Sequence, residues 1–112
     1  MTLLATDVQG KAATIGASPV VTTLPLAHAK AWRLHIVNNH ASQTIDAVRL
    51  RRRTHAAGPS SDWVSVTSGV PVAAGGVLAV VPDADDCAEE LDVELTASGS
   101  GTGVAFWLAG TL

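Results

Sequence analysis

Residues 91–109 read LDVELTASGSGTGVAFWLA, and this stretch decides the fold. Large apolar residues alternate with polar or smaller ones on both sides of a glycine-rich turn, first at Leu91, Val93 and Leu95 and then at Val104, Phe106 and Leu108. A period of two residues is typical of a strand that buries one face. The stretch therefore predicts two half-buried strands with a turn at residues 99–103 between them.

Other segments of the chain also have the pattern of strands bounded by turn residues. Residues 32–37 alternate in the same way, with Trp32, Leu34 and Ile36 on one face. Four more segments are rich in β-branched residues and bounded by Gly, Pro, Ser or Asn, at residues 19–24, 44–53, 62–67 and 77–81. Helical periodicity is nearly absent, and only residues 84–90 could form a single turn, capped by Asp83. Seven or eight short strands predict an all-β, single-domain β-sandwich, either a jelly roll or immunoglobulin-like.

A chain of 112 residues with 47% apolar residues is long enough to bury one core. Residues 1–18 have a weak pattern and are predicted to be an N-terminal arm or the first edge strand, whereas residues 19–112 form the sandwich domain. The inner faces of the two sheets are predicted to hold Trp32, Leu34, Ile36, Val48, Leu50, Val64, Val66, Leu78, Val80, Leu91, Val93, Leu95, Phe106 and Leu108.

Charge is divided along the chain. Residues 1–53 contain all seven Lys and Arg residues and two acids, whereas residues 54–112 contain the other eight acids and no Lys or Arg. Four of the bases lie together at Arg49, Arg51, Arg52 and Arg53, and seven of the acids lie between Asp83 and Glu94. Opposed patches on a small apolar domain indicate a surface that meets a second copy or a partner of complementary charge.

The arginine run has two interpretations. On a strand, Arg49, Arg51 and Arg53 share one face, and Asp92 and Glu94 share one face of another strand. We expect the two rows to pair, either across a subunit contact or between strands of one sheet, and the sequence leaves both open. An acidic pI of about 5.7 and the lack of aromatic residues between the arginines argue against nucleic acid.

No motif for catalysis, a cofactor or a metal stands in the sequence. A G-x-S-x-G nucleophile motif is absent, the four histidines lack metal-ligand spacing, and the acidic run at 83–90 lacks the spacing of a calcium loop. Cys87 is the only cysteine, so no disulfide can form within the chain. No apolar run approaches the ~20 residues that span a bilayer, and residues 1–7 lack a basic signal-peptide start. These features predict a non-enzymatic protein made in the cytoplasm, without a cofactor or a membrane partner.

Three tryptophans give the chain a second class of candidate function. Trp107 alternates with Phe106 and Leu108 and is therefore predicted to point outward, where an indole usually marks a contact surface. Trp32 and Trp63 fall at core or rim positions. Because indole faces also stack on sugar rings, Trp63 or Trp107 could instead serve as a carbohydrate-binding platform.

Six segments carry a resemblance to a known group of proteins: WRLHIVN at 32–38, TIDAVRL at 44–50, DWVSV at 62–66, VPVAAGG at 70–76, LDVELT at 91–96 and VAFWL at 104–108. Together they resemble small virion proteins of tailed bacteriophages, most of all head decoration or cement proteins with a β-sandwich or jelly-roll fold. The resemblance covers roughly residues 19–110 and rests on strand rhythm and composition. It implies a non-enzymatic protein in many copies that clamps neighbouring major capsid subunits, helped by its N-terminal arm.

The sequence therefore predicts a structural protein of a virion that contacts the major capsid protein or another virion protein and forms a homo-dimer or homo-trimer. The predicted interface residues are Arg49, Arg51, Arg53, Asp92, Glu94 and Trp107. The alternative is a carbohydrate-binding β-sandwich module of a tail or fibre.

Overall fold

A computed structural model of the protein describes residues 3–55, 58–66, 71–81 and 88–112. These residues form eight strands and no helix: β1 (Leu4–Ile15), β2 (Val20–Pro25), β3 (Ala31–Asn38), β4 (Ile45–Arg53), β5 (Val64–Ser65), β6 (Val77–Val80), β7 (Glu90–Ala97) and β8 (Thr102–Thr111). The helical turn predicted at residues 84–90 lies mostly outside the described residues, as does Cys87.

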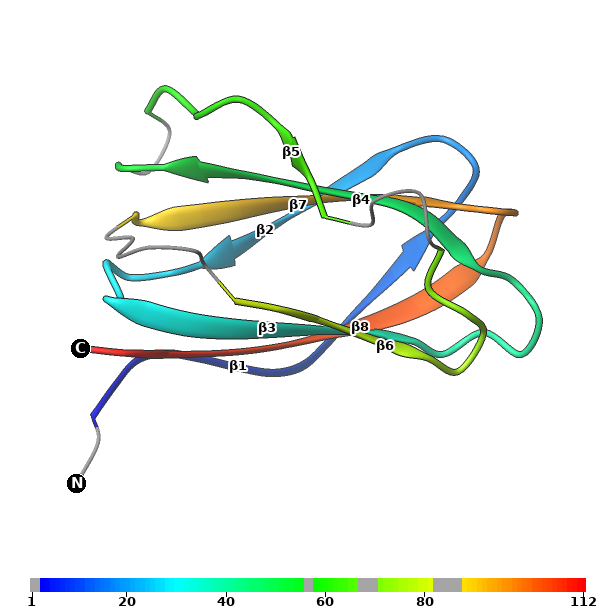
Figure 1. The fold of residues 1–112 in the computed structure, drawn as a ribbon, viewed down its shortest axis with the longest axis horizontal. Coiled ribbons are helices and arrows are strands. Elements are labelled where there is room, and N and C mark those ends of the chain that lie inside the picture. The colour runs from blue at the N-terminus through cyan, green and yellow to red at the C-terminus, as the bar shows by residue number, and fades with distance from the viewer. Residues whose placement is uncertain (1–2, 56–57, 67–70, 82–87) are drawn as a thin grey trace.

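The strands form two four-stranded antiparallel sheets that pack face to face (Figure 1). One sheet has the order β1-β8-β3-β6 and the other has the order β2-β7-β4-β5. Strands β1 to β4 alternate between the two sheets, so no two consecutive strands among them pair with each other. This interleaved order is that of a jelly roll, which settles the choice that the sequence left open.

Residues Leu4–Ile15 form β1, an edge strand that pairs with β8. The register between the two strands shifts between Leu4 and Thr6 and again between Val8 and Lys11. Gly10 lies within the second shift with a φ of 66°, a left-handed conformation that glycine adopts without steric cost. These irregularities move side chains from one face of the strand to the other, which explains the weak pattern of this segment.

The predicted core is largely confirmed. Most of the predicted inward residues are buried, and Val66, Leu78 and Val80 are partly buried against them. Val64 is an exception, because 55% of it is exposed at the start of the two-residue strand β5, at the edge of its sheet. Buried apolar positions outside the predicted set of inner-face residues are Ile15, Leu24, Leu26, Ala29, Ile45, Val72, Ala88, Ala97 and Val104.

Asn38, at the end of β3, fixes one end of the sandwich. The residue is fully buried, and its Nδ2 donates to the carbonyl oxygens of Gln43, Val72 and Ala73 at 2.8, 3.3 and 3.2 Å. Its Oδ1 accepts a hydrogen bond from the amide of His40 at 3.1 Å. A single buried amide thus ties the end of β3 to the backbone of Gln43, Val72 and Ala73.

Candidate functional site

The three arginines of β4 pair with acids of β7 on the outer face of the second sheet. The register aligns them in three rungs, which we call the arginine ladder: Arg49 with Glu94, Arg51 with Asp92 and Arg53 with Glu90. Arg49 donates to Glu94 Oε1 from Nη2 at 2.6 Å and from Nε at 2.8 Å. Glu90 is more distant, with its Oε1 at 3.9 Å from Arg53 Nη1.

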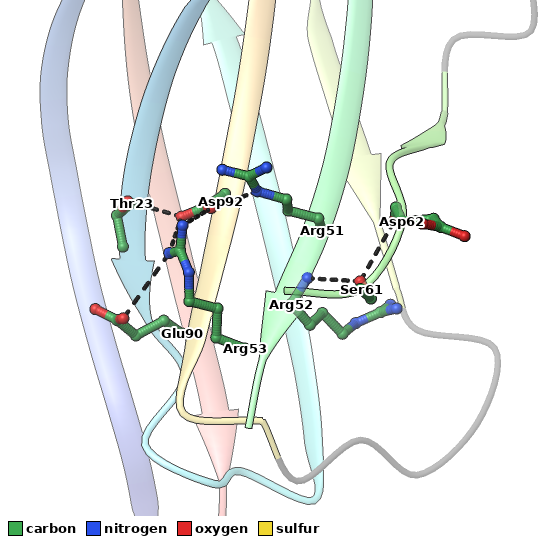
Figure 2. A network of polar contacts seen from close by, with 8 residues as sticks. All are labelled: Thr23, Arg51, Arg52, Arg53, Ser61, Asp62, Glu90 and Asp92. Carbon is green, nitrogen blue, oxygen red and sulfur yellow. Dashed lines mark hydrogen bonds and ion pairs between the residues drawn. The ribbon is translucent and has the colours of Figure 1, made fainter. Parts of the chain in front are cut away.

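Asp92 is the centre of the ladder (Figure 2). Its side chain is completely buried, and its two oxygens accept hydrogen bonds from Arg51 Nε at 2.7 Å, from Arg53 Nη1 at 2.8 Å and from Thr23 Oγ1 at 2.8 Å. Arg53 Nη2 also lies 2.7 Å from Asp92 Oδ2. Burial by itself raises the pKa of Asp92, but the hydrogen bonds from Arg51, Thr23 and Arg53 outweigh burial, so this pKa lies below its ordinary value of 3.8.

Trp63 covers the ladder from the loop before β5. The guanidinium carbons of Arg51 and Arg49 lie 4.3 and 5.1 Å from the centre of its ring, which places both cations over the indole. Trp63 is partly buried, in agreement with the prediction of a rim position. Because the arginines occupy its ring, this tryptophan is a poor candidate for a sugar platform.

The ladder shows that the arginines and the acids pair within one chain. Of the two pairings that the sequence left open, the pairing between strands of one sheet is present within a single chain. The arginines share one face as predicted, but Arg51 and Arg53 are largely covered, since their side chains are only 27% and 20% exposed. Whether the ladder also contacts another chain stays a prediction.

The outer face of the other sheet carries Trp107, and we call it the Trp107 face. As predicted, Trp107 points outward, with 46% of its surface exposed, while its neighbours Phe106 and Leu108 are buried. On β3 the residue opposite Trp107 is His35, and the residue opposite Ala109 is Arg33. Asp7 of β1 lies opposite Ala109 on the other side of β8.

A depression of about 420 Å³, the Trp107 hollow, opens on this face. It is lined by Asp7, Val8, Gln9, Arg33, His35, Trp107, Leu108 and Ala109. The small side chain of Ala109 leaves room between its larger neighbours on β1 and β3. The indole of Trp107 leans toward β1, where a Cβ added to Gly10 would lie 3.2 Å from its Cζ2. The bulge at Gly10 therefore supports the indole.

Two opposite charges stand at the sides of the hollow. Asp7 Oδ2 accepts a hydrogen bond from Gln9 Nε2 at 2.9 Å, and Arg33 is exposed. Within the part of the chain that the structure describes, neither residue has an ion-pair partner. Sequence reasoning missed both as site residues. The alternation along residues 32–37 does place Arg33 and His35 on the outer face, away from Trp32 and Leu34. It does not show which strands lie next to this one.

The described residues include no group of three His, Cys, Asp or Glu side chains that could hold a metal ion. Nor does any helix in them have the length and apolar character needed to cross a membrane. The Trp107 face combines an exposed indole, a hollow and hydrogen-bonding groups, which are the kinds of groups that line ligand-binding pockets.

No protein-family model matches this chain, and no curated protein sequence matches it. Solved structures share its fold. A chitosan-binding module of a chitosanase/glucanase from Paenibacillus sp. IK-5 superposes with a TM-score of 0.58 and 16% identity, over 88% of this chain and 74% of the module. The family 32 carbohydrate-binding module of NanJ from C. perfringens, solved with galactose, superposes with a TM-score of 0.54 and 18% identity, over 86% of this chain and 69% of the module.

A capsid structure shares the fold as well. A chain of the T13 IBDV viral particle matches with a TM-score of 0.50 and 12% identity; it covers 100% of this chain, which spans only 30% of the viral one. At such identities the matches establish the β-sandwich fold alone. These neighbours are binding modules and a capsid protein rather than catalytic domains.

Proposed function

We propose that the chain is a non-enzymatic structural protein of a bacteriophage virion, of the decoration or cement type, which binds the major capsid protein or another virion protein. The observation that carries the proposal is the Trp107 face. Here the exposed Trp107, Val77 and Val81 lie on or beside a sheet face that is otherwise rich in alanine. An exposed tryptophan on a small domain is typical of a protein contact.

The capsid-like fold and the resemblance in the sequence support the same function. Jelly rolls occur in viral capsid domains. The arginine ladder contributes less to this argument than the charge division suggested, because its charges are neutralised within the sheet. The contact with the shell is therefore assigned to the Trp107 face in this proposal, and the ladder stabilises the domain that presents it.

Trp107→Ala is expected to weaken binding to shells assembled from the major capsid protein of the same virus. Removing an anchoring tryptophan from a contact typically weakens the binding free energy by about 2 kcal/mol or more, which raises the dissociation constant by a factor of about 30 or more. Co-sedimentation with the shells measures the effect. Val64→Ala is the control, because Val64 is 55% exposed but belongs to the opposite sheet. Wild-type protein that stays in the supernatant would contradict the proposed function.

A second function, carbohydrate binding, is favoured by the Trp107 hollow. An aromatic ring beside a carboxylate, an amide, an imidazole and a guanidinium is the set of groups that holds a sugar, because the ring stacks on C–H groups and the polar groups bond hydroxyls. Of the modules described above, one binds chitosan and the other was solved in complex with galactose. This function would suit a module of a tail or fibre.

Tryptophan fluorescence separates the two functions. If the hollow binds sugar, soluble glycans from a panel will change the emission of the protein, and the change will disappear in Trp107→Phe or Trp107→Ala but persist in Trp63→Phe. A structural protein of a shell will give no response to any glycan. A response that is lost with Trp63 and kept with Trp107 would place the sugar on the other sheet and contradict the assignment to the hollow.

A further inference from the structure

We infer that the Trp107 face is self-complementary and packs face to face against the same face of a second copy of this chain. The inference deepens the proposed structural function and rests on it for its setting, since an assembly protein is expected to contact its own copies. Three side chains on neighbouring strands make the face self-complementary.

Asp7, Ala109 and Arg33 form one row across β1, β8 and β3. Ala109 lies in the middle, and the acid and the base lie one strand away on either side. Neighbouring strands are about 4.8 Å apart, so the backbones of Asp7 and Arg33 are separated by roughly 10 Å. Each charge lacks an ion-pair partner among the described residues. The row therefore has opposite signs at its two ends and a small neutral centre.

A two-fold axis that runs parallel to β8 above Ala109 makes this row complementary to itself. Rotation about such an axis places Asp7 of the second copy over Arg33, and Arg33 of the second copy over Asp7. Both ion pairs form at once, which is the defining property of a contact between identical surfaces. The strands of the two facing sheets then run nearly parallel to one another, the aligned arrangement in which sheets commonly pack.

Trp107 fits the same axis. It lies on β8 two residues from Ala109, so the axis passes over it as well, and the two copies bring their indoles together. Because each indole leans toward its own β1 and over Gly10, the space above His35 on the β3 side stays open. The rotation brings the indole of the second copy to that space. The two rings then lie beside each other and each covers a histidine, instead of colliding.

The remainder of the face suits close approach. Ala105 and Ala109 flank Trp107 on β8, Ala79 lies opposite His35 on β6, and Val37 and Val77 continue the apolar surface. Two sheets that meet face to face are separated by about 10 Å, a distance that small side chains and interleaved indoles can fill. A pairing of this kind covers the whole Trp107 face. In the dimer it excludes sugar binding in the hollow and competes with the shell contact proposed above, so the shell would be bound by the dissociated monomer.

The test is a charge swap read by light scattering. Wild-type protein is expected to be a dimer that loosens as the salt concentration rises. Asp7→Arg alone places two arginine pairs face to face, and Arg33→Glu alone places two acid pairs face to face, so each variant is expected to be monomeric, with a dissociation constant raised at least about a hundredfold. An equimolar mixture of the two variants restores both ion pairs and is expected to form a mixed dimer.

The mixture distinguishes a lost contact from a lost fold, because two damaged proteins would not rescue each other. Lys11→Glu is the matched control for Arg33→Glu. It makes the same change of charge, but Lys11 Nζ points to Thr23 O at the side of the sandwich and not to the Trp107 face. A wild-type monomer, a wild-type trimer, or a mixture that stays monomeric would each overturn the inference. Binding to shells is measured separately, so the proposed function can survive any of these results.

Discussion

Asp92→Asn is expected to lower the free energy of unfolding by about 3 kcal/mol, the low end of the range for breaking a buried ion pair. The variant keeps the size of the side chain but removes the negative charge that Arg51 and Arg53 share. The two guanidinium groups would then face each other beside a neutral amide at the centre of the sheet. The cost stays at the low end because these arginines are 27% and 20% exposed, so water can partly solvate them.

Thermal or urea unfolding of the two variants Asp92→Asn and Glu94→Gln measures the effect. Glu94→Gln is the matched control, since it is the same acid-to-amide change two residues along β7. Its partner Arg49 is 43% exposed, so this rung is expected to contribute less than about 1 kcal/mol. Equal losses in the two variants would contradict the central place given to Asp92.

The same carboxylate gives the stability a dependence on pH. Because the pKa of Asp92 is lower in the folded protein than its ordinary value of 3.8, the folded state favours the ionised form. Its contribution is complete above pH 3.8 and is lost as the pH falls through the lowered folded-state pKa. Wild-type protein is therefore expected to lose stability in this acidic window more steeply than Asp92→Asn. Parallel pH curves for the two proteins would show that other carboxylates dominate.

The arginine ladder was only partly predictable from the sequence. Alternation correctly predicted that Arg49, Arg51 and Arg53 share a face and that Asp92 and Glu94 share another. It could not predict that β4 and β7 are neighbours, because strand adjacency depends on how both sheets pack. The residues that complete the network, Thr23 and Trp63, come from two further segments. Their contribution depends on the same adjacency.

The strand positions were predictable for a physical reason, and the topology was not. A buried face requires a period of two residues, and this requirement acts locally along each strand. The order of strands is set by contacts between distant segments, so the chain pattern fitted a jelly roll and an immunoglobulin-like sandwich equally well. Residues 91–109 illustrate the difference, because the two strands in this stretch belong to opposite sheets.

The candidate site was only partly predictable. The outward orientation of Trp107 follows from alternation with buried neighbours, and it is confirmed. Asp7 and Arg33 were not recognised, because the β1 bulge at Gly10 interrupts the pattern and because their closeness depends on β8 lying between β1 and β3. A hollow formed by a small residue between larger ones has no signature in a single strand.

Phe106→Ala is expected to lower the free energy of unfolding by about 3–5 kcal/mol, the range for deleting a large aromatic side chain from a core. Phe106 is fully buried at the middle of β8, the strand that pairs with both β1 and β3. Its removal leaves a cavity between the two sheets at a point where three strands meet. Chemical denaturation followed by circular dichroism measures the loss.

Trp107→Ala is the matched comparison, because it removes the next aromatic residue on the same strand from the opposite face. Its indole is half-exposed and lies over Gly10, which has no side chain, so we expect a loss of stability below about 1 kcal/mol. The two neighbours then separate two roles: Phe106 holds the sheets together, whereas Trp107 serves contacts outside the domain. A stability loss in Trp107→Ala as large as that in Phe106→Ala would mean that the indole is part of the fold. In that case the exposed indole would no longer be evidence that this face is a binding surface.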